Sequence, residues 1–250
     1  MYPTLDEVRK IAASGDYRRI PVSRELYADA FTPVEVLRTL RAASHHCYLL
    51  ESAEENQKWG RYSFLGYSPA MELTCQNNVL KIRTGEEDEL AAEENRAISH
   101  PGETIRKILA AYKSPKLPDM PPFTGGLVGY FSYDYIHYAE PTLDFSKLKN
   151  DDFCDVDLML FDRVIVFDHY RQKLILIAGV RTDSLEKSYR QAEESLNEIV
   201  SLLQSGAKAV FRPLKLKEEL APAFSKEEYG AMVEKARHYI HEGDIFQVVL

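Results

Sequence analysis

Apolar residues recur at intervals of three or four along two long segments, which is the spacing of one helix face. The first segment runs from about Asp183 to Gln204, and the second follows Ser225. Gly206 and Gly243 stand just beyond these segments, where helices commonly end. We therefore predict two long amphipathic helices, each packing along one face.

Capping residues predict two further helices near the amino terminus. Thr4 and Thr32 are each followed three residues later by a glutamate, Glu7 and Glu35. In this capping box the threonine accepts from a free helix amide and the glutamate accepts from the cap residue's own amide. Pro33 suits the first helical position, because its fixed φ already matches the helix.

The remaining apolar segments are short and rich in aromatic and β-branched residues, as strands are. A polar turn, Asp168–Gln172, joins the apolar runs Leu158–Phe167 and Lys173–Ile177 and predicts a hairpin. Strands outnumber the helices between them, which favours an α+β fold rather than a regular alternation of strands and helices. The other predicted strands are Cys47–Glu51, Tyr62–Gly66, Met71–Cys75 and Leu127–Phe131.

Three polar segments are predicted to be connections. The acidic run Glu86–Glu94 is interpreted as a solvated loop or a helix beside a loop, and the proline-dense Ser114–Pro122 as a loop. The third, Arg212–Ala223, carries charges and two prolines between the two long helices. We interpret it as a linker between two parts of the chain.

Composition and charge narrow the class of protein. Of 250 residues, 45% are hydrophobic and 28% are charged, which is typical of a globular chain. The net charge of -8 disfavours nucleic acid and anionic membrane surfaces as partners. No apolar run approaches the roughly 18 residues of a membrane span, and no basic-then-apolar leader is present, so we expect a cytoplasmic protein.

The strand end at Leu50, Glu51 and Ser52 is a candidate amino-acid site. It is followed by the segment Trp59–Gly66. A carboxylate beside a hydroxyl can hold a zwitterion, with Glu51 attracting the ammonium and Ser52 or nearby amides bonding the rest. The plain alternative is a strand that leaves into a solvated loop, and the spacing of these residues does not decide between the two.

Neither of two other conspicuous segments predicts a cofactor site. The glycines of Pro122–Asp134 lack the Gly-Lys-Ser/Thr ending of a phosphate loop, and in a strand they permit close backbone approach. The aspartates of Asp155–His169 are spread along strands, and His169 is interpreted as a turn residue, so we predict no metal site. The three cysteines include no C-x-x-C pair, and we expect reduced thiols.

Four segments together resemble the large, chorismate-binding subunit of anthranilate synthase (component I), and less closely that of aminodeoxychorismate synthase. The resemblance implies an L-tryptophan-binding feedback site at Leu50, Glu51 and Ser52. It implies conversion of chorismate and ammonia to anthranilate and pyruvate in tryptophan biosynthesis, with Mg²⁺ and with ammonia from a glutamine amidotransferase subunit (component II). The four segments are Leu49–Ser52, Gly60–Gly66, Pro122–Asp134 and Tyr239–Leu250.

The same resemblance implies a sandwich in which antiparallel sheets pack face to face with helices outside, and it implies a domain organisation. Residues 1–211 correspond to the regulatory domain, 212–223 to a linker, and 224–250 to the start of the chorismate-binding catalytic domain. Phe246–Leu250 is predicted to be a strand that the chain leaves unfinished. We therefore expect the Mg²⁺ ligands and main catalytic residues to lie beyond it, and the chain alone to be inactive. Gln247 is the one catalytic candidate, since related isochorismate-forming enzymes have a lysine there.

Two alternatives to this assignment stay open at the level of sequence. One is the component I subunit of aminodeoxychorismate synthase in folate biosynthesis, which shares many of the same sequence motifs. The other is a noncatalytic amino-acid-binding module.

Overall fold

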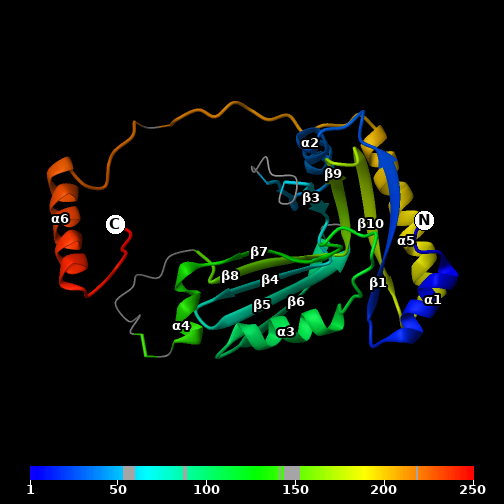
Figure 1. The fold of residues 1–250 in the computed structure, drawn as a ribbon, viewed down its shortest axis with the longest axis horizontal. Helices are drawn as coiled ribbons and strands as arrows, with labels where there is room; N and C mark the ends of the chain where they lie inside the picture. The colour runs from blue at the N-terminus through cyan, green and yellow to red at the C-terminus, as the bar shows by residue number, and fades with distance from the viewer. Residues whose placement is uncertain (53–59, 87–88, 141, 144–152, 218) are drawn as a thin grey trace. The chain divides into compact units, whose positions relative to one another are not determined.

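Two five-stranded antiparallel sheets form the framework of residues Met1–Val210 (Figure 1). The computed structural model describes residues 1–250 except 53–59, 87–88, 141, 144–152 and 218. The chain divides into two compact units, Met1–Val210 and Phe211–Leu250. The two sheets with helices around them confirm the predicted α+β class.

The first sheet, called sheet 1, has the strand order β1-β10-β9-β3-β2. The hairpin predicted around Asp168–Gln172 is confirmed as β9 and β10, paired from Lys173 opposite Asp168. β2 is an edge strand and pairs with β3, with Leu50 opposite Phe64. The strands are β1 (Arg19–Tyr27), β2 (Cys47–Leu50), β3 (Tyr62–Tyr67), β9 (Arg163–Asp168) and β10 (Lys173–Arg181).

Sheet 2 has the order β6-β5-β4-β8-β7. Its hairpin of β5 and β6 corrects the expectation of a loop or helix at Glu86–Glu94. Strand pairing with β5 satisfies the backbone of this acidic segment, and a charge-rich edge strand also resists pairing with other chains. The strands are β4 (Met71–Gln76), β5 (Val79–Glu86), β6 (Glu89–Ala97), β7 (Gly126–Phe131) and β8 (Val156–Phe161).

The two sheets share a corner at which the chain passes twice from one sheet to the other. β3 continues into β4 through Ser68–Ala70, and β8 continues into β9 through Asp162. The predicted single strand Leu158–Phe167 is therefore wrong, since Asp162 divides it. Asp162 lies between the last pairs of the two ladders, where the chain changes sheets, and its carbonyl accepts from the Gly179 amide at 3.1 Å.

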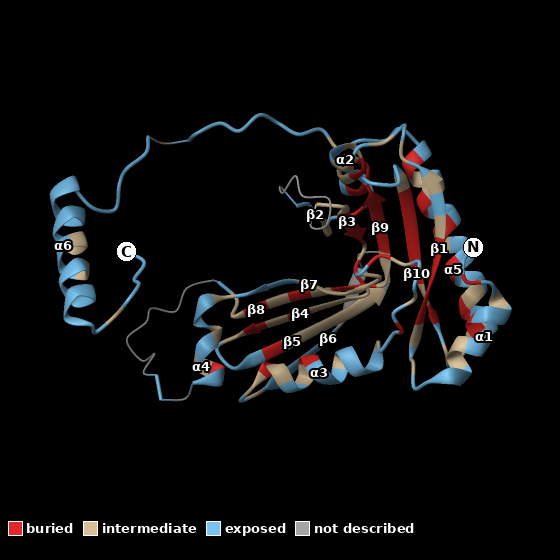
Figure 2. Ribbon diagram, viewed as in Figure 1, coloured by how far each residue is buried: buried red, intermediate tan, exposed pale blue. Residues whose placement is uncertain are grey.

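Three helices, α1 (Leu5–Ser14), α2 (Pro33–Ala43) and α5 (Leu185–Gln204), pack on one face of sheet 1. Figure 2 shows the buried residues along β9, β10 and α5. The helix starts at Thr4 and Thr32 are confirmed: the Glu7 carboxylate accepts from the Thr4 amide at 2.7 Å, and Thr32 Oγ1 accepts from the Glu35 amide at 3.2 Å, while the Glu35 carboxylate bonds Lys208. The central contacts of this core come from fully buried side chains, including Ile20, Leu40, Leu65, Leu174, Leu176, Leu196 and Ile199.

Sheet 2 has its own core against α3 (Pro101–Ala111), η1 (Tyr133–Tyr135) and α4 (Ile136–Ala139). Tyr138 anchors it, because its buried hydroxyl donates to Asp155 Oδ2 at 2.9 Å and accepts from the Asn78 amide at 3.2 Å. Burial raises the pKa of Tyr138, so the hydroxyl keeps its proton for this bond. The buried apolar members of the cluster are Leu73, Cys75, Leu80, Ile105, Val156 and Leu158.

The unit Phe211–Leu250 contains one helix, α6 (Lys226–Glu242). Its capping box is complete, with the Glu228 amide 3.2 Å from Ser225 Oγ, and Gly243 ends the helix in the left-handed region at φ 84°. The predicted strand Phe246–Leu250 is wrong for this structure. No described segment of the unit offers these residues a strand ladder, and Phe246 is 94% exposed. No helix among the described residues is long and apolar enough to span a bilayer.

Candidate functional site

Leu50, Glu51 and Ser52 lie where β2 ends, at the outer edge of sheet 1. All three are exposed. Successive residues of a strand point to opposite faces, so Leu50 and Glu51 lie on different faces of the sheet. A ligand beside the open edge of β2 can nevertheless contact side chains from both faces. Trp59 and the rest of segment 53–59 lie outside the described residues.

Glu51 is contacted by a buried serine of the neighbouring strand. Ser63 on β3 is 1% exposed, and its hydroxyl lies 3.4 Å from Glu51 Oε1. The same hydroxyl lies 2.7 Å from the Nε2 atom of His169, in the turn after β9. The structure thus connects three polar side chains from β2, β3 and the β9–β10 turn. Reasoning from sequence did not identify Ser63 and gave His169 only a turn role.

An ion pair fixes this end of the sheet. The guanidinium of Arg61 bonds both carboxylate oxygens of Asp168, which is 1% exposed. Burial alone would raise the pKa of Asp168, but the bonds from Arg61 and from the Arg171 and Tyr170 amides outweigh it and lower that pKa. Asp168 therefore stays ionised and holds the β9–β10 turn closed.

An aromatic cluster lies on the Leu50 face of sheet 1. The Phe64 ring meets the Phe123 ring edge to face, with centroids 5.9 Å apart, and the centroid of the Tyr62 ring also lies 5.9 Å from that of Phe64. Leu50 stands directly opposite Phe64 in the register. The strand end thus combines a carboxylate on one face with apolar and aromatic surface on the other. An amino acid with a large apolar side chain carries the complementary groups.

The glycine-rich segment Pro122–Asp134 has the structural role predicted for it. A Cβ atom at Gly129, in β7, would lie 2.0 Å from the carbonyl oxygen of Asp157 on β8. Its φ of 156° also lies in the region that favours glycine. This glycine lets β7 approach β8, and the segment forms no phosphate-binding loop.

Gln247 lies in the unit Phe211–Leu250, after α6, and is exposed. Leu50, Glu51 and Ser52 belong to the other unit, Met1–Val210. The candidate role of Gln247 in catalysis stays a prediction.

Within the described residues, no group of three or more histidines, cysteines, aspartates or glutamates is arranged to hold a metal ion. Cys75 is buried, and Cys47 and Cys154 are half-buried. Burial raises the pKa of the Cys75 thiol, which makes it a poor nucleophile at neutral pH.

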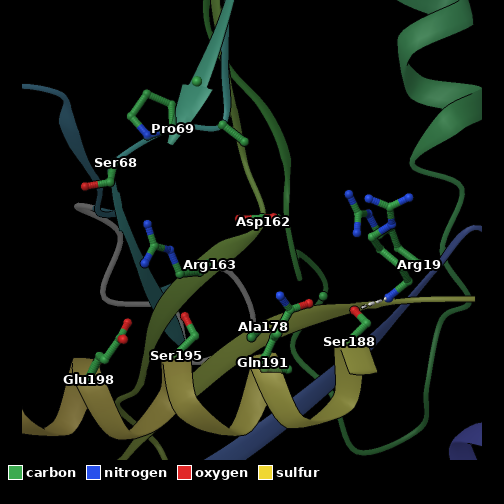
Figure 3. Close-up of a pocket in the computed structure, with 15 residues that line it drawn as sticks. Arg19, Ser68, Pro69, Asp162, Arg163, Ala178, Ser188, Gln191, Ser195 and Glu198 are labelled. Atoms are coloured by element: carbon green, nitrogen blue, oxygen red, sulfur yellow. Dashed lines mark hydrogen bonds between the residues drawn. The ribbon is translucent and has the colours of Figure 1, made fainter. Parts of the chain in front are cut away.

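A polar cavity opens beside α5 near the corner of the two sheets (Figure 3). Ser188, Ser195 and Glu198 project into it from the helix, and arginines reach it from the strands. Positive and negative groups are mixed along its wall, so the cavity does not select ligands of one charge. The charged residues of the wall are Arg19, Asp162, Arg163, Arg181 and Glu198.

Comparison with known proteins shows the family to which the chain belongs. A family described as chorismate binding enzyme matches residues 80–250, which is more than half of the chain. "Anthranilate synthase component 1" of Acetivibrio thermocellus is 36% identical over 100% of this chain and 50% of its own length. The protein of that name from Acinetobacter calcoaceticus is 33% identical over 98% of this chain and 49% of its own length.

A solved structure agrees with these relatives. The crystal structure of anthranilate synthase component I from Streptococcus pneumoniae TIGR4 is 25% identical, with a TM-score of 0.52 over 88% of this chain and 46% of that chain. The chain spans about half the length of the curated relatives that it matches.

Proposed function

The chain belongs to the family of chorismate-binding enzymes, and from this premise we propose that it is the L-tryptophan-binding regulatory part of an anthranilate synthase component I. The observation that carries the proposal is the exposed Glu51 carboxylate at the edge strand β2, whose other face carries Leu50 beside the Phe64–Phe123 aromatic pair. Glu51 binds the ammonium of tryptophan, Ser52 bonds its polar groups, and Leu50 contacts its apolar part.

The whole enzyme converts chorismate and ammonia to anthranilate and pyruvate. Tryptophan at the β2 edge favours a state in which the chorismate site works poorly, and by linkage chorismate weakens tryptophan binding by the same factor. The names of the relatives, component 1, imply a second component, and a glutamine amidotransferase that supplies ammonia fits that place.

The proposal divides the chain into a regulatory domain, 1–211, a linker, 212–223, and the beginning of the catalytic domain, 224–250. The separation of Met1–Val210 from Phe211–Leu250 into two units supports this division. Gln247 then contributes to the chorismate site. Mg²⁺ serves the reaction, but the described residues offer no ligand set for it, so we assign no residue of this chain to the metal.

Calorimetry of the chain with L-tryptophan tests the proposal. Glu51→Gln keeps the size of the side chain and removes its charge, and we expect binding to weaken roughly ten- to a hundredfold, as for other charged hydrogen bonds. Glu25→Gln is the matched control, because Glu25 is also a glutamate of an edge strand of sheet 1 and pairs with Lys173. Its affinity should equal that of the wild type.

Two analogues of tryptophan test whether Glu51 contacts the ammonium group of the ligand. Tryptamine keeps the ammonium and lacks the carboxylate, and indole-3-propionate has the reverse. Glu51→Gln should weaken the binding of tryptamine and leave indole-3-propionate unaffected or bound more tightly. Absence of tryptophan binding by the wild-type chain, or equal binding by Glu51→Gln, contradicts the proposed site.

A further inference from the structure

The hydroxyl of Ser63 joins the imidazole of His169 to the carboxylate of Glu51. The Oγ–Nε2 distance is 2.7 Å and the Oγ–Oε1 distance is 3.4 Å. In the β2–β3 register Leu50 lies opposite Phe64, so the next step places Glu51 opposite Ser63 on the same face. Ser63 is 1% exposed, so water does not replace its two partners.

The number of protons available to donate fixes the direction of these two hydrogen bonds. A serine hydroxyl has one proton to donate, and an ionised carboxylate can only accept. Ser63 therefore donates to Glu51, and its oxygen accepts from His169, which must carry its proton on Nε2. Both bonds then point from His169 toward Glu51.

The backbone around His169 holds the imidazole in place. Its amide donates to the Arg61 carbonyl at 2.9 Å, and its carbonyl accepts from Gln172 Nε2 at 2.6 Å. The ring stacks on Phe167 at an interplanar angle of 16°. The Arg61–Asp168 ion pair closes the same turn. The imidazole thus stands on a rigid support, although the residue itself is exposed.

We propose that His169 and Ser63 are positioning residues, which orient the Glu51 carboxylate for the ammonium group of an amino-acid ligand. The inference rests on the proposed function, because it takes Glu51 as the ammonium-binding group. A carboxylate held in advance loses less rotational freedom when the ligand binds, and ligand-contacting groups gain precision from such supporting hydrogen bonds. Neither residue needs to contact the ligand.

Substitutions in this chain test the role by calorimetry with L-tryptophan. Ser63→Ala and His169→Phe should each weaken binding about three- to tenfold, the range expected from freeing one side chain. Phenylalanine keeps a ring that can stack on Phe167. His169→Gln should recover most of the affinity, because its amide can donate from nearly the place of Nε2.

The matched control for Ser63→Ala is Ser23→Ala. Ser23 is also a buried serine on a strand of sheet 1, but its hydroxyl bonds the Tyr2 carbonyl. Ser23→Ala should bind tryptophan as the wild type does. If Ser63→Ala and His169→Phe bind like the control while Glu51→Gln is impaired, the positioning role is overturned and the proposed function stands.

If tryptophan binding itself fails, a measurement without ligand still tests the hydrogen bonds from His169 through Ser63 to Glu51. Long-range ¹H–¹⁵N spectra of histidine-labelled chain, at about pH 8.5 where ordinary histidines are neutral, report which ring nitrogen carries the proton. His169 should show the Nε2–H form in the wild type and a changed tautomer balance in Ser63→Ala. A proton fixed on Nδ1, or spectra unchanged by Ser63→Ala, contradicts the positioning role of His169 and Ser63 whether or not tryptophan binds.

Discussion

Arg61, which precedes β3, and Asp168, at the end of β9, form a bidentate ion pair with Nε–Oδ1 and Nη2–Oδ2 distances of 3.0 and 2.6 Å. Asp168 is 1% exposed, and the Arg61 side chain is 30% exposed. The guanidinium also lies over the Tyr62 and Tyr170 rings, 4.7 and 5.6 Å from their centroids. The pair therefore fixes the turn that carries His169 beside the candidate site.

Removal of Arg61 should destabilise the protein strongly. Arg61→Ala leaves the Asp168 carboxylate buried without its cation, and such changes cost about 3 kcal/mol or more. Urea unfolding measures the free energy. Arg9→Ala is the control, because Arg9 pairs with Asp6 and Glu186 at the surface, and exposed pairs contribute below about 1 kcal/mol. Equal losses in the two variants would contradict the role given to the buried pair.

The same pair predicts how stability depends on pH. The pKa of Asp168 is lowered in the folded state, so its ionisation stabilises the fold above the unfolded value of about 4. This contribution is lost as the pH falls below about 4 toward the lowered folded pKa.

The side chain introduced by Asp168→Asn cannot ionise, so this variant tests whether ionisation of Asp168 stabilises the fold. The difference in unfolding free energy between wild type and Asp168→Asn should be largest at neutral pH and shrink at about pH 3. Asp16→Asn, at an exposed aspartate that pairs with Arg18, controls for the loss of one negative charge. A difference that stays constant between the two pH values would contradict the assignment.

Tyr48→Phe should leave the free energy of unfolding unchanged or raise it by up to about 1 kcal/mol. The Tyr48 hydroxyl is buried and has no hydrogen-bond partner among the described residues, while its ring packs on Phe161 with centroids 4.8 Å apart. Removing an unsatisfied buried polar group relieves its desolvation cost. Thermal and urea unfolding measure the change.

Tyr138→Phe is the contrasting tyrosine variant. The Tyr138 hydroxyl contacts Asp155, Asn78 and the buried Cys75, so its removal takes a hydrogen-bond partner from each and should cost about 1–3 kcal/mol. If Tyr48→Phe destabilises as much as Tyr138→Phe, the Tyr48 hydroxyl has a partner and the prediction is wrong.

Gly129→Ala should cost about 3 kcal/mol or more, because the new Cβ atom would meet backbone, the Asp157 carbonyl at 2.0 Å. The control is Gly230→Ala within α6, where a Cβ atom meets nothing within 4 Å. That change should stabilise the helix by about 0.5–1 kcal/mol. Circular dichroism with urea titration compares the two, and a mild effect of Gly129→Ala would contradict the close approach of β7 and β8.

Local chemistry explains which elements could be predicted. Thr4, Thr32 and Ser225 each stand at a helix start because the capping interaction involves residues only three positions apart. The β9–β10 hairpin was predictable for the same reason, since its polar turn and flanking apolar strands are neighbours in sequence. The acidic strand β6 was not, because its pairing with β5 outweighs the low strand propensity of its residues.

By itself the sequence determined the helix starts, which depend on short-range chemistry, and the α+β class, while the candidate site at Leu50, Glu51 and Ser52 came from the family resemblance and stays a prediction. Only the tertiary structure decided that Asp162 divides one apolar run between two sheets. Only it brought His169 to Ser63, 106 positions away, and Ser63 to the Glu51 carboxylate. The register of β2, β3 and β9 sets those contacts, and register depends on packing of whole sheet faces, which no short segment encodes.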